Sequence, residues 1–473
     1  MTSQYPPNDA GRSAAPGSHL IVQKFLDTLR RTQFLPPQKM RDYQRALLTP
    51  LLRHARDNVP FYRDSGRLAP LFRADDSIDW DRWRDIPPLT RGELQREFER
   101  LKAESLPANH GRLFLLSTSG STGEPAKVIH TELAIRWAWA ALRLRDFEWH
   151  QIDPTRRLAY LYPFTYDDFD ITGTHTRRGW RPEYIPLNMA GERVDIADTR
   201  PATELVETVA SVRPAYLQVQ PTALQLMLAC DHKNLLADLK LAAVFTHGEH
   251  VSHEFKHHVE SRLRCKLFDL YGSTECNYFA CTCPKCGNFH VHSETVLVEA
   301  IDESGNDVPA GEVGRLLVTP LYSYAMPLIR YDHNDFARLA ADECTVKLQS
   351  FAEIIGKNRD PFIFPDGRTI RPTPPTDAII KFLGAQTVQI AQTGPDRCEF
   401  RIMPGSLHPS RMQFDAMTNF VRRIWWEGLQ VDYRIVEGFT RQSPRAKFQM
   451  IKQEFFNPSD YLGKLSKPAG ETS

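Results

Sequence analysis

Apolar residues recur at helical spacing through most of the first third of the chain. Ile21, Phe25 and Leu29 lie four positions apart, so they share one face of a helix. The same spacing, together with prolines at which helices stop, predicts helices at residues 19–35, 40–58, 91–104 and 131–149. Residues 1–18 are rich in Pro, Ser, Gly and Ala, and we expect a disordered tail there rather than a secretory signal.

Short apolar runs alternate with helical segments from residue 158 onward. The runs predict strands at 158–162, 216–219, 241–245 and 266–270, and the segments predict helices at 202–212, 221–229 and 253–264. This alternation favours a largely parallel sheet, because parallel neighbours need a crossover connection that a helix usually supplies. Beyond residue 290 the segments become short and β-rich, and a second module starts near Ile355. The pattern predicts an α/β fold, and the length of 473 residues allows more than one domain.

Polar turns follow three of the predicted strands. Ligands of parallel α/β sheets bind beyond the carboxyl ends of the strands, so turns that share this edge can form one site. The three turns are Ser117–Gly123, Thr246–Glu249 and Tyr271–Glu275. We predict that they hold the ligand together.

The first of these turns belongs to a hydroxyl-rich loop. Residues 117–127 read Ser-Thr-Ser-Gly-Ser-Thr-Gly-Glu-Pro-Ala-Lys and directly follow an apolar run. Gly120 and Gly123 permit positive φ angles and close approach of the backbone, so main-chain N–H groups can surround a polyphosphate. The loop is not a Walker motif, because no Gly-Lys-Ser/Thr sequence closes it. The alternative is a solvated linker.

Two further segments carry acidic residues suited to a nucleotide. In Tyr271–Glu275, the tyrosine ring is suited to stack on a purine, and Glu275 is suited to hold Mg²⁺ that bridges phosphates. The alternative is an ordinary turn with a solvated glutamate. Asp335 is suited to accept hydrogen bonds from two ribose hydroxyls, and its alternative role is that of a turn-capping aspartate.

Charge and hydropathy disfavour two classes of protein. The net charge is +1, which does not indicate a strongly basic surface for nucleic acid. No run of about 18 apolar residues occurs, so we expect no membrane span and no membrane partner. The chain has eight cysteines, and their clustering suits metal ligation in a reducing compartment, which predicts a cytoplasmic protein.

The clustered cysteines are followed by two histidines. The candidate ligands are Cys276, Cys281, Cys283, Cys286, His290 and His292. The Cys-Pro-Lys-Cys-Gly sequence resembles a zinc knuckle, and a Cys₃His set suits tetrahedral Zn²⁺. We favour Cys281, Cys283, Cys286 and His290, in a metal loop over residues 276–292, with Cys276 and His292 as reserves. Four protein ligands leave no open position for catalysis, so we expect a structural metal; chance clustering of free cysteines is the other interpretation.

The motifs together resemble the adenylate-forming superfamily. The hydroxyl-rich loop is similar to its phosphate-binding signature, Tyr271–Glu275 to its Tyr-Gly-x-Thr-Glu signature, and Asp335 to its ribose-binding aspartate. Within that superfamily the likeness is greatest to the phenylacetate–CoA ligase branch, and it covers residues 40–455. The segments that carry this likeness are 54–62, 86–91, 248–252 and 311–331.

The resemblance implies a fold and a two-step reaction. The fold has a large N-terminal domain, residues 19–358, with mixed, mostly parallel sheets flanked by helices and a β-rich subdomain. A small mobile α+β lid domain, residues 359–473, follows it. ATP, with Mg²⁺, and an aromatic or related carboxylic acid first give an acyl-adenylate and pyrophosphate. A nucleophile, usually the thiol of CoA, then displaces AMP. Relatives often form homodimers.

The resemblance also assigns roles to individual residues. Lys447 matches the catalytic lysine that bridges the carboxylate and the α-phosphate, with Lys452 as the alternative, and Glu275 matches the Mg²⁺ ligand. The residues expected to bind the nucleotide are Ser119, Gly120, Ser121, Thr122, Gly123, Lys127, Gly248, Glu249, Tyr271, Gly272, Ser273, Thr274, Asp335 and Lys357. The acid is expected to contact the aromatic residues Tyr162, Phe164, Tyr166 and Phe169, for which core packing is the alternative.

The acceptor and the catalytic competence stay open. A related enzyme class passes the activated acyl group to an amine, a carrier protein or another small nucleophile. A zinc-knuckle protein for nucleic acid is disfavoured by the near-zero net charge. A nucleotide-binding protein without activity is suggested by Lys357 and Ala446, which stand where relatives usually carry Arg and Gly.

Overall fold

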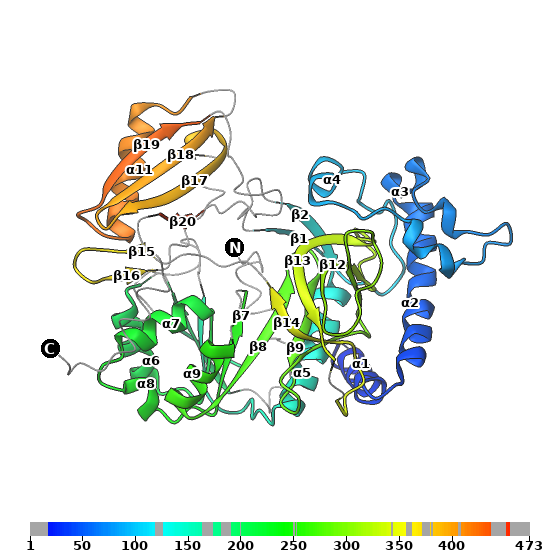
Figure 1. The fold of residues 1–473 in the computed structure, drawn as a ribbon, viewed down its shortest axis with the longest axis horizontal. Coiled ribbons are helices and arrows are strands. Elements are labelled where there is room, and N and C mark those ends of the chain that lie inside the picture. The colour runs from blue at the N-terminus through cyan, green and yellow to red at the C-terminus, as the bar shows by residue number, and fades with distance from the viewer. Residues whose placement is uncertain are drawn as a thin grey trace.

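The fold is given by a computed structural model of the chain (Figure 1). It describes residues 18–118, 126–162, 174–180, 191–198, 200–248, 251, 253–341, 344–355, 362–370, 379, 382–404, 408–436 and 451–454. This part of the chain contains a twelve-stranded sheet, a four-stranded sheet and two two-stranded sheets.

Helices dominate the first hundred residues, as the apolar spacing predicts. Their bounds are α1 Ser18–Thr32, α2 Pro37–Asn58, α3 Pro60–Ser65 and α4 Arg91–Arg96, with 3₁₀ turns η1 Ala69–Leu71 and η2 Trp80–Asp85 between the last two. Prolines occupy the first positions of α2 and α3, where a missing N–H costs nothing. Helix α4 starts at a capping box, in which Thr90 and Glu93 satisfy each other's backbone N–H groups. It ends at Arg96, earlier than the predicted helix over 91–104.

The large sheet is mixed. Its strands are β3 Leu158–Tyr162, β4 Thr174–Arg178, β5 Glu192–Ala197, β6 Tyr216–Val219, β7 Ala243–His247, β8 Lys266–Ser273, β9 Asn277–Thr282, β10 Phe289–Val291, β11 Val296–Ile301, β12 Val313–Pro320, β13 Tyr331–Leu339 and β14 Ser350–Ile355. They lie in the order β11-β12-β13-β14-β10-β9-β8-β7-β6-β3-β5-β4. The neighbours from β5 to β8 are parallel, and the β-rich strands beyond β8 are antiparallel. The predicted α/β architecture is confirmed.

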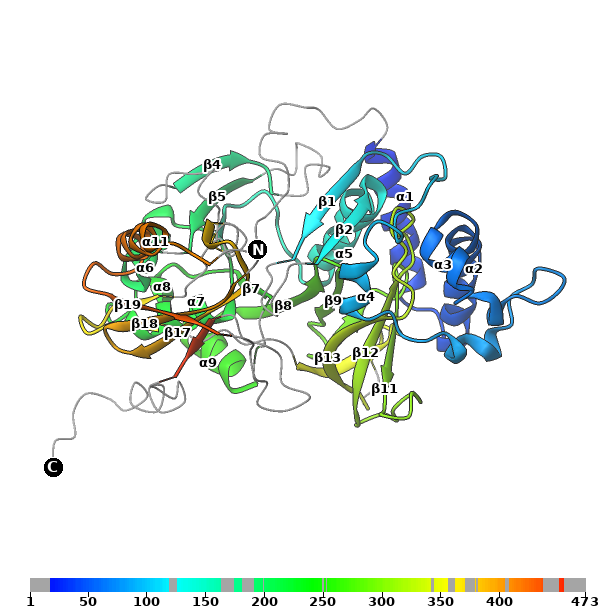
Figure 2. The same ribbon diagram turned by 90° about the horizontal axis from the view of Figure 1, so that it is seen from above.

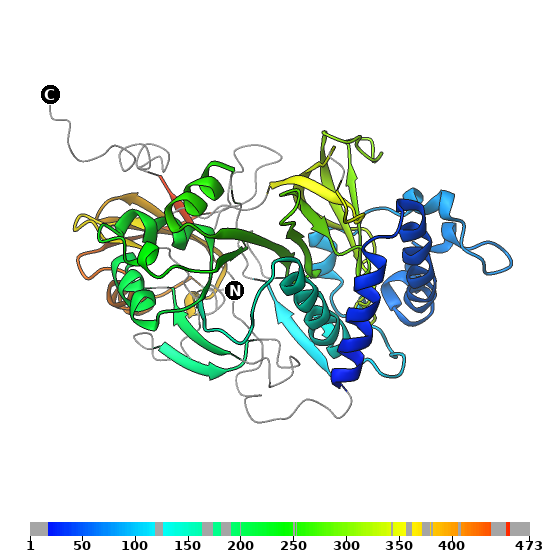
Figure 3. The same cartoon turned by 90° about the horizontal axis from the view of Figure 1, so that it is seen from below.

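Helices cover both faces of the parallel half. Helices α6 Ala202–Val212, α7 Pro221–Cys230, α8 Leu235–Asp238 and α9 His253–Leu263 pack on one face. On the other face lies α5 Trp139–Trp149, which continues the π-helical turn η3 Leu133–Ala138 and runs beside α1 (Figure 3). Side chains alternate accordingly, since Val244 and Leu267 contact the first group whereas Phe245 and Phe268 contact α5.

A short hairpin lies beside the β-rich half of the large sheet (Figure 2). Its strands β1 Leu113–Ser117 and β2 Lys127–Thr131 pair antiparallel, with Ser117 opposite Lys127. Thr118 N donates to Ala126 O at 2.9 Å, and Ala126 N donates to Thr118 Oγ1 at 3.0 Å. Both ends of the hydroxyl-rich loop are therefore tied together.

The described residues between Phe362 and Ile451 form a separate apolar cluster. The four-stranded sheet has the order β19-β18-β17-β20, with β17 Ala385–Gly394, β18 Arg397–Pro404, β19 Gln430–Ile435 and β20 Ile451–Gln453. Helix α11 Arg411–Ile424 packs on this sheet, and the strands β15 Phe362–Ile363 and β16 Thr369–Ile370 complete the cluster. In Figure 1 this sheet lies above α6 and α7. The boundary between residues 358 and 359 falls outside the described residues and stays a prediction.

Among the helices of the described residues, none is both long and apolar enough to cross a bilayer.

Candidate active site

Two of the three predicted turns lie at one edge of the large sheet. Strands β7 and β8 are parallel and in register, with Thr246 beside Asp269, and Thr246 Oγ1 donates to Asp269 Oδ1 at 2.8 Å. Gly248 follows β7 with a φ angle of +82°, which favours glycine. Strand β8 extends to Ser273, so Tyr271 to Ser273 are the end of a strand rather than a turn. The chain then turns at residues 274–276.

Tyr271 and Asp335 meet although they are far apart in the sequence. Tyr271 Oη donates to Asp335 Oδ2 at 2.7 Å, and His333 Nδ1 lies 2.8 Å from the same oxygen. Asp335 and His333 reach this point because both belong to β13 and share one face of it. Burial raises the pKa of Tyr271 well above its ordinary value, so the phenol stays protonated and keeps donating. The carboxylate of Asp335 is therefore oriented at the sheet edge by two side chains.

Glu275 carries a buried carboxylate with an arginine partner. Arg91 Nη1 lies 2.8 Å from Glu275 Oε1, and Arg91 Nη2 donates to Thr118 Oγ1 at 2.8 Å. Tyr331 Oη donates to Glu275 Oε1 at 3.2 Å, and burial raises the pKa of Tyr331 well above its ordinary value. The glutamate is only 7% exposed. One guanidinium thus joins the carboxylate to the start of the hydroxyl-rich loop.

The segment before α4 holds Arg91 in place. Leu89 N donates to Arg330 O at 3.0 Å, and Asp332 N donates to Leu89 O at 2.9 Å, so the segment pairs with β13 like a short extra strand. The capping box of α4 fixes the next turn. Residues 86–91 carry part of the family resemblance, but nothing in this segment assigns a role to Arg91. At the start of a short helix, no residue spacing distinguishes an arginine of a site from one that is exposed to solvent.

The backbone around residues 272–274 is closely packed. A Cβ on Gly272 would lie 2.5 Å from Asn277 O, because β8 and β9 approach each other there. Ser273 Oγ accepts from Cys276 N at 3.1 Å, and His130 Nε2 lies 2.8 Å from Thr274 O. Burial lowers the pKa of His130, so the ring is neutral and donates this hydrogen bond. These contacts fix the position of the turn that ends at Glu275.

An aromatic layer lies at the carboxyl ends of β3 and β7. The rings of Tyr162 and His247 are stacked, with centroids 6.0 Å apart, and Tyr160 stacks on Tyr162 at 5.5 Å. Arg193 lies over the Tyr160 ring at 4.2 Å. The sequence predicts Tyr162 as an acid-binding residue and His247 only as a member of the turn Thr246–Glu249, and it does not predict Tyr160.

Several predicted site residues fall outside the described residues, so their positions stay predictions. They are Ser119, Gly120, Ser121, Thr122, Gly123, Glu249, Phe164, Tyr166, Phe169, Lys357 and Lys447. Lys127 is described and opens β2, and its side chain is exposed. The alternative Lys452 lies in β20, where its Nζ is 3.1 Å from Glu454 Oε1.

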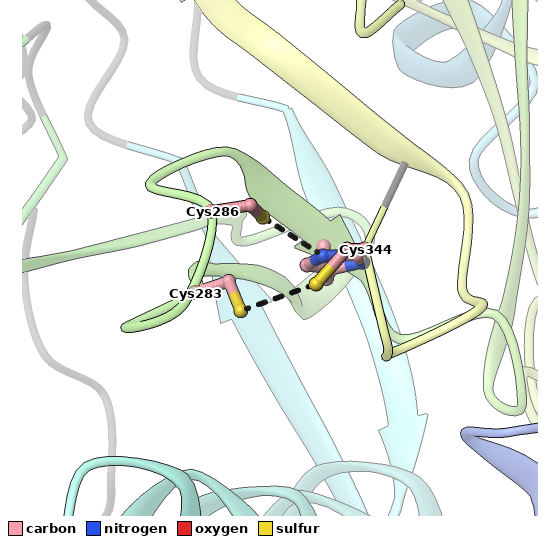
Figure 4. Close-up of side chains that lie close together, drawn as sticks. Cys283, Cys286 and Cys344 are labelled. Carbon is pink, nitrogen blue, oxygen red and sulfur yellow. Dashed lines mark hydrogen bonds between the residues drawn. The ribbon is translucent and has the colours of Figure 1, made fainter. Parts of the chain in front are cut away.

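Metal-ligating side chains gather on the β-rich side of the sheet. Within the described residues, one candidate ligand atom from each of Cys283, Cys286, His290 and Cys344 lies within 4.8 Å of every other (Figure 4). Three of these residues were predicted as ligands. The fourth position differs, because the geometry brings in Cys344 and leaves Cys281 out.

Cys281 is turned to another part of the interior. It lies within β9, and its Sγ is 3.5 Å from His150 Nε2, at the end of α5. Cys283 is the first residue beyond β9. The chain turns there, and two hydrogen bonds close the turn: Cys283 N donates to Asn288 O, and Gly287 N donates to Cys283 O. This turn carries Cys283 and Cys286 away from Cys281.

The two reserve ligands also lie outside the cluster. His292 Nδ1 lies 2.6 Å from Arg145 Nη2, and Cys276 is buried in the apolar cluster that contains Phe279 and Val291. No sequence pattern points to Cys344, which is 61 positions from Cys283 and belongs to no Cys-x-x-Cys pair.

The residues present suit the two metals that the sequence analysis predicts. A buried carboxylate such as Glu275 is the oxygen ligand that Mg²⁺ prefers when phosphates supply the remaining ligands. Three thiols and one imidazole form a set typical of structural Zn²⁺.

Comparison with known proteins identifies the family of the chain. The family model described as AMP-binding enzyme matches residues 66–320, which is more than half of the chain. A phenylacetate-coenzyme A ligase of Thermus thermophilus is 26% identical over 326 residues, covering 66% of this chain and 68% of the relative. One of Pseudomonas putida is 23% identical over 354 residues, covering 72% of this chain and 76% of the relative.

Solved structures match the fold over most of the chain. A crystal structure of 2-hydroxyisobutyryl-CoA ligase with 2-HIB-AMP and CoA superposes with a TM-score of 0.58 at 16% identity, covering 92% of this chain and 94% of that one. At this identity the likeness supports the fold alone. The chain belongs to the family of AMP-binding enzymes, within the adenylate-forming superfamily.

Proposed function

We propose that the protein is an ATP-dependent carboxylate-activating ligase that forms an acyl-adenylate and then an acyl-CoA thioester. The observation that carries the proposal is the pair of buried carboxylates at one sheet edge. Asp335 is oriented by Tyr271, and Glu275 is joined through Arg91 to the hydroxyl-rich loop. Asp335 is thus positioned to accept hydrogen bonds from the ribose, and Glu275 lies on the phosphate side; different elements hold the two carboxylates in place.

The first step joins the acid to the α-phosphate. A carboxylate oxygen of the acid attacks the α-phosphorus, and the bond to the bridging oxygen of pyrophosphate breaks. Asp335 accepts hydrogen bonds from the ribose hydroxyls, and main-chain N–H groups of Ser119–Gly123 bind the phosphates. Lys447 places its ammonium between the two reacting anions. Mg²⁺ bound to Glu275 would neutralise phosphate charge.

The second step uses the adenylate as an activated acyl group. The thiol of CoA, as thiolate, attacks the acyl carbon, and AMP leaves with the bonding electron pair. Between the two steps, the region after residue 358 would rotate, with Lys357 next to the hinge. This rotation would move Lys447 away from the adenylate and form the site for the thiol. This order of events follows the family resemblance.

The acid is proposed to be aromatic or a related small carboxylic acid. The stacked rings of Tyr160, Tyr162 and His247 provide a flat wall beside the nucleotide edge. Two of the relatives described above are named phenylacetate-coenzyme A ligases. The acidic residues Asp167, Asp168 and Asp170 favour an acid that carries an amino or hydroxyl group.

Acid-dependent exchange of labelled pyrophosphate into ATP tests the adenylation step. We expect exchange with at least one member of a panel of aromatic and hydroxy acids. Glu275→Gln and Asp335→Asn should each lower the exchange by about 100-fold, since each removes charge at a reacting or binding centre. Lys447→Ala should lower it similarly, and Lys452→Ala serves as its control. An enzyme that exchanges nothing with the whole panel, yet binds AMP, would contradict the proposal and favour the non-catalytic interpretation.

The acceptor is tested separately. With the acid found by exchange, CoA, a panel of amines and a phosphopantetheinylated carrier protein are offered in turn, and the acyl product is identified by mass spectrometry. Acyl-CoA as the main product supports the proposal. Transfer to an amine or a carrier protein, with CoA inert, assigns the alternative within the same superfamily. The cytoplasm is the proposed compartment, on the strength of the cysteine content, and a homodimer stays a prediction.

A further inference from the structure

Four potential metal ligands come from three separate segments. Cys283 and Cys286 lie in the turn between β9 and β10, and His290 belongs to β10. Cys344 lies in the connection from β13 to β14. Figure 4 shows the three thiols pointing toward one centre from two sides. The site therefore joins two segments that are distant in the sequence.

The distances fit a tetrahedral ion. Cys283 Sγ and Cys344 Sγ are 3.9 Å apart, and Cys286 Sγ and His290 Nε2 are 3.4 Å apart. Two thiolates at Zn–S distances of about 2.3 Å and at the tetrahedral angle are about 3.8 Å apart. A disulfide is not formed, since its sulfurs would lie about 2.05 Å apart. The two pairs thus have the separations that a shared zinc ion imposes.

A backbone carbonyl selects the ligand atom of the histidine. His290 Nδ1 lies 3.1 Å from Leu348 O, which is an acceptor only. The proton must therefore be on Nδ1, and Nε2 is left with a lone pair that faces Cys286. Zinc-bound histidines usually donate their second ring nitrogen to such an acceptor, because this fixes the ring and its tautomer.

The turn that carries the first two thiols is preformed. Gly287 has a φ angle of +79°, and Cys283 N and Gly287 N are both hydrogen-bonded within residues 283–288. Lys285 Nζ also reaches across to Thr345 Oγ1 at 3.0 Å, beside Cys344. The two segments thus contact each other on either side of the ligands.

We propose that Cys283, Cys286, His290 and Cys344 bind one structural Zn²⁺ that fastens the β9–β10 turn to the β13–β14 connection. Binding releases the protons of the three thiols, and all four positions around the ion are filled by protein. Strand β13 carries Asp335, and β9 follows Glu275. The ion would hold these strands together at the end away from the nucleotide. The metal site stands without the proposed ligase activity, and only its effect on nucleotide binding rests on that proposal.

Metal content of two single variants tests the ligand set. The full chain is purified without chelators, and zinc is measured by plasma mass spectrometry. We expect about one zinc per chain in the wild type and in Cys281→Ser, and less than about a tenth of that in Cys344→Ser. Cys281→Ser is the matched control, because this buried thiol is in β9 but outside the cluster. Zinc retained in Cys344→Ser and lost in Cys281→Ser would overturn the assignment, as would a wild type without zinc.

A second measurement covers the case in which Cys344→Ser fails to fold. Titrating the wild-type protein with a mercurial reagent should release its zinc into a chromogenic chelator. Cys344→His, which keeps a zinc ligand, should retain at least about half of the metal. A wild type from which the reagent releases no zinc overturns the proposal whatever the fate of the serine variant.

The bracing role has its own readout. Zinc removal should speed hydrogen exchange in residues 331–355 and weaken AMP binding measured by calorimetry. If zinc is present but the protein neither binds nor exchanges nucleotide, the proposed function fails and the metal site stands. If nucleotide binding and hydrogen exchange are the same with and without zinc, the bracing role fails.

Discussion

At the scale of single residues, the site depends on how the charge of Glu275 is balanced. A buried carboxylate is costly unless a cation and hydrogen bonds accompany it. Arg91 supplies the cation, and its planar guanidinium reaches Thr118 with a second nitrogen at the same time. An ammonium has no such fork, so lysine would not make both contacts in the same way. The pair therefore couples the acid to the position of the loop.

The variant Arg91→Met tests this coupling. It leaves Glu275 buried beside Tyr331 without its cation, so we expect a loss of about 2 kcal/mol of stability and a rise in the KM for ATP. Melting temperature and pyrophosphate exchange measure the two effects. Arg100→Met is the control, because Arg100 forms exposed ion pairs with Asp64 and Glu97, and water and salt screen such pairs so that they contribute little to stability.

A double variant identifies the cause of that loss. In Arg91→Met with Glu275→Gln the carboxylate charge is gone, so the melting temperature should recover toward that of the wild type. If the double variant is as unstable as the two single changes added together, the arginine acts by packing rather than by pairing with Glu275.

The sequence motifs predict both members of the Tyr271–Asp335 pair, but only one member of the Glu275–Arg91 pair. Glu275, Asp335 and Tyr271 stand in short motifs that the sequence alone makes visible. Arg91 is 184 positions from Glu275, and no local pattern records that distance. The same holds for Cys344, because a single cysteine in a polar stretch gives no spacing. Local sequence patterns therefore do not predict contacts between residues that are far apart in the chain.

At the scale of elements, the junction of β8 and β9 determines where the site residues point. The register between the two strands shifts between Tyr271 and Gly272, so the end of β8 departs from regular pairing. Apolar periodicity predicted β8 as far as Leu270, because its remaining residues are polar or glycine. It also overextended α4, which the charged residues beyond Arg96 do not continue as a helix. Periodicity thus predicts the buried part of an element better than its end at the site.

Gly272→Ala tests the close approach at this junction. The added Cβ would lie 2.5 Å from Asn277 O and 2.8 Å from Tyr278 Cα, and main-chain atoms cannot rotate out of the way. We expect a loss of about 1–3 kcal/mol and at least a tenfold fall in exchange, because Tyr271 and the turn to Glu275 are displaced. Gly394→Ala is the matched control, since its new Cβ would meet only side-chain atoms, at 3.6 Å and 3.8 Å. Equal activity of the two variants would refute the argument from close approach.

At the scale of the whole molecule, a buried polar layer connects the N-terminal helices to the sheet. Arg145 of α5 is fully buried and lies 2.6 Å from Glu294, which also accepts from Thr32 Oγ1 of α1 at 3.0 Å. Asp146, the next residue of α5, accepts from Tyr278 Oη of β9, and His150, just beyond the end of α5, contacts Cys281 of β9. Because these ionisable groups are buried, the stability of the molecule depends on pH. Each group raises or lowers the stability according to the direction of its own pKa shift.

His150 should make the protein less stable in mild acid. Burial, assisted by the charge of Arg143, lowers the pKa of His150 to about 3, whereas an unfolded histidine titrates near 6.5. The unfolded chain therefore binds the proton first as the pH falls below about 6.5, and stability drops by about 2 kcal/mol by pH 5. Burial raises the pKa of Asp146 to about 6, which acts in the opposite direction below that pH and offsets part of the loss.

Comparing the variant His150→Gln with the wild type isolates the histidine, because Asp146 is present in both. The melting temperature of the wild type should fall by a few degrees more than that of His150→Gln between pH 8 and pH 5. His257→Gln, which removes an exposed histidine of α9, should behave as the wild type does. Parallel pH curves for the wild type and His150→Gln would mean that the ring binds its proton in the folded protein, and that the layer beneath α5 admits water.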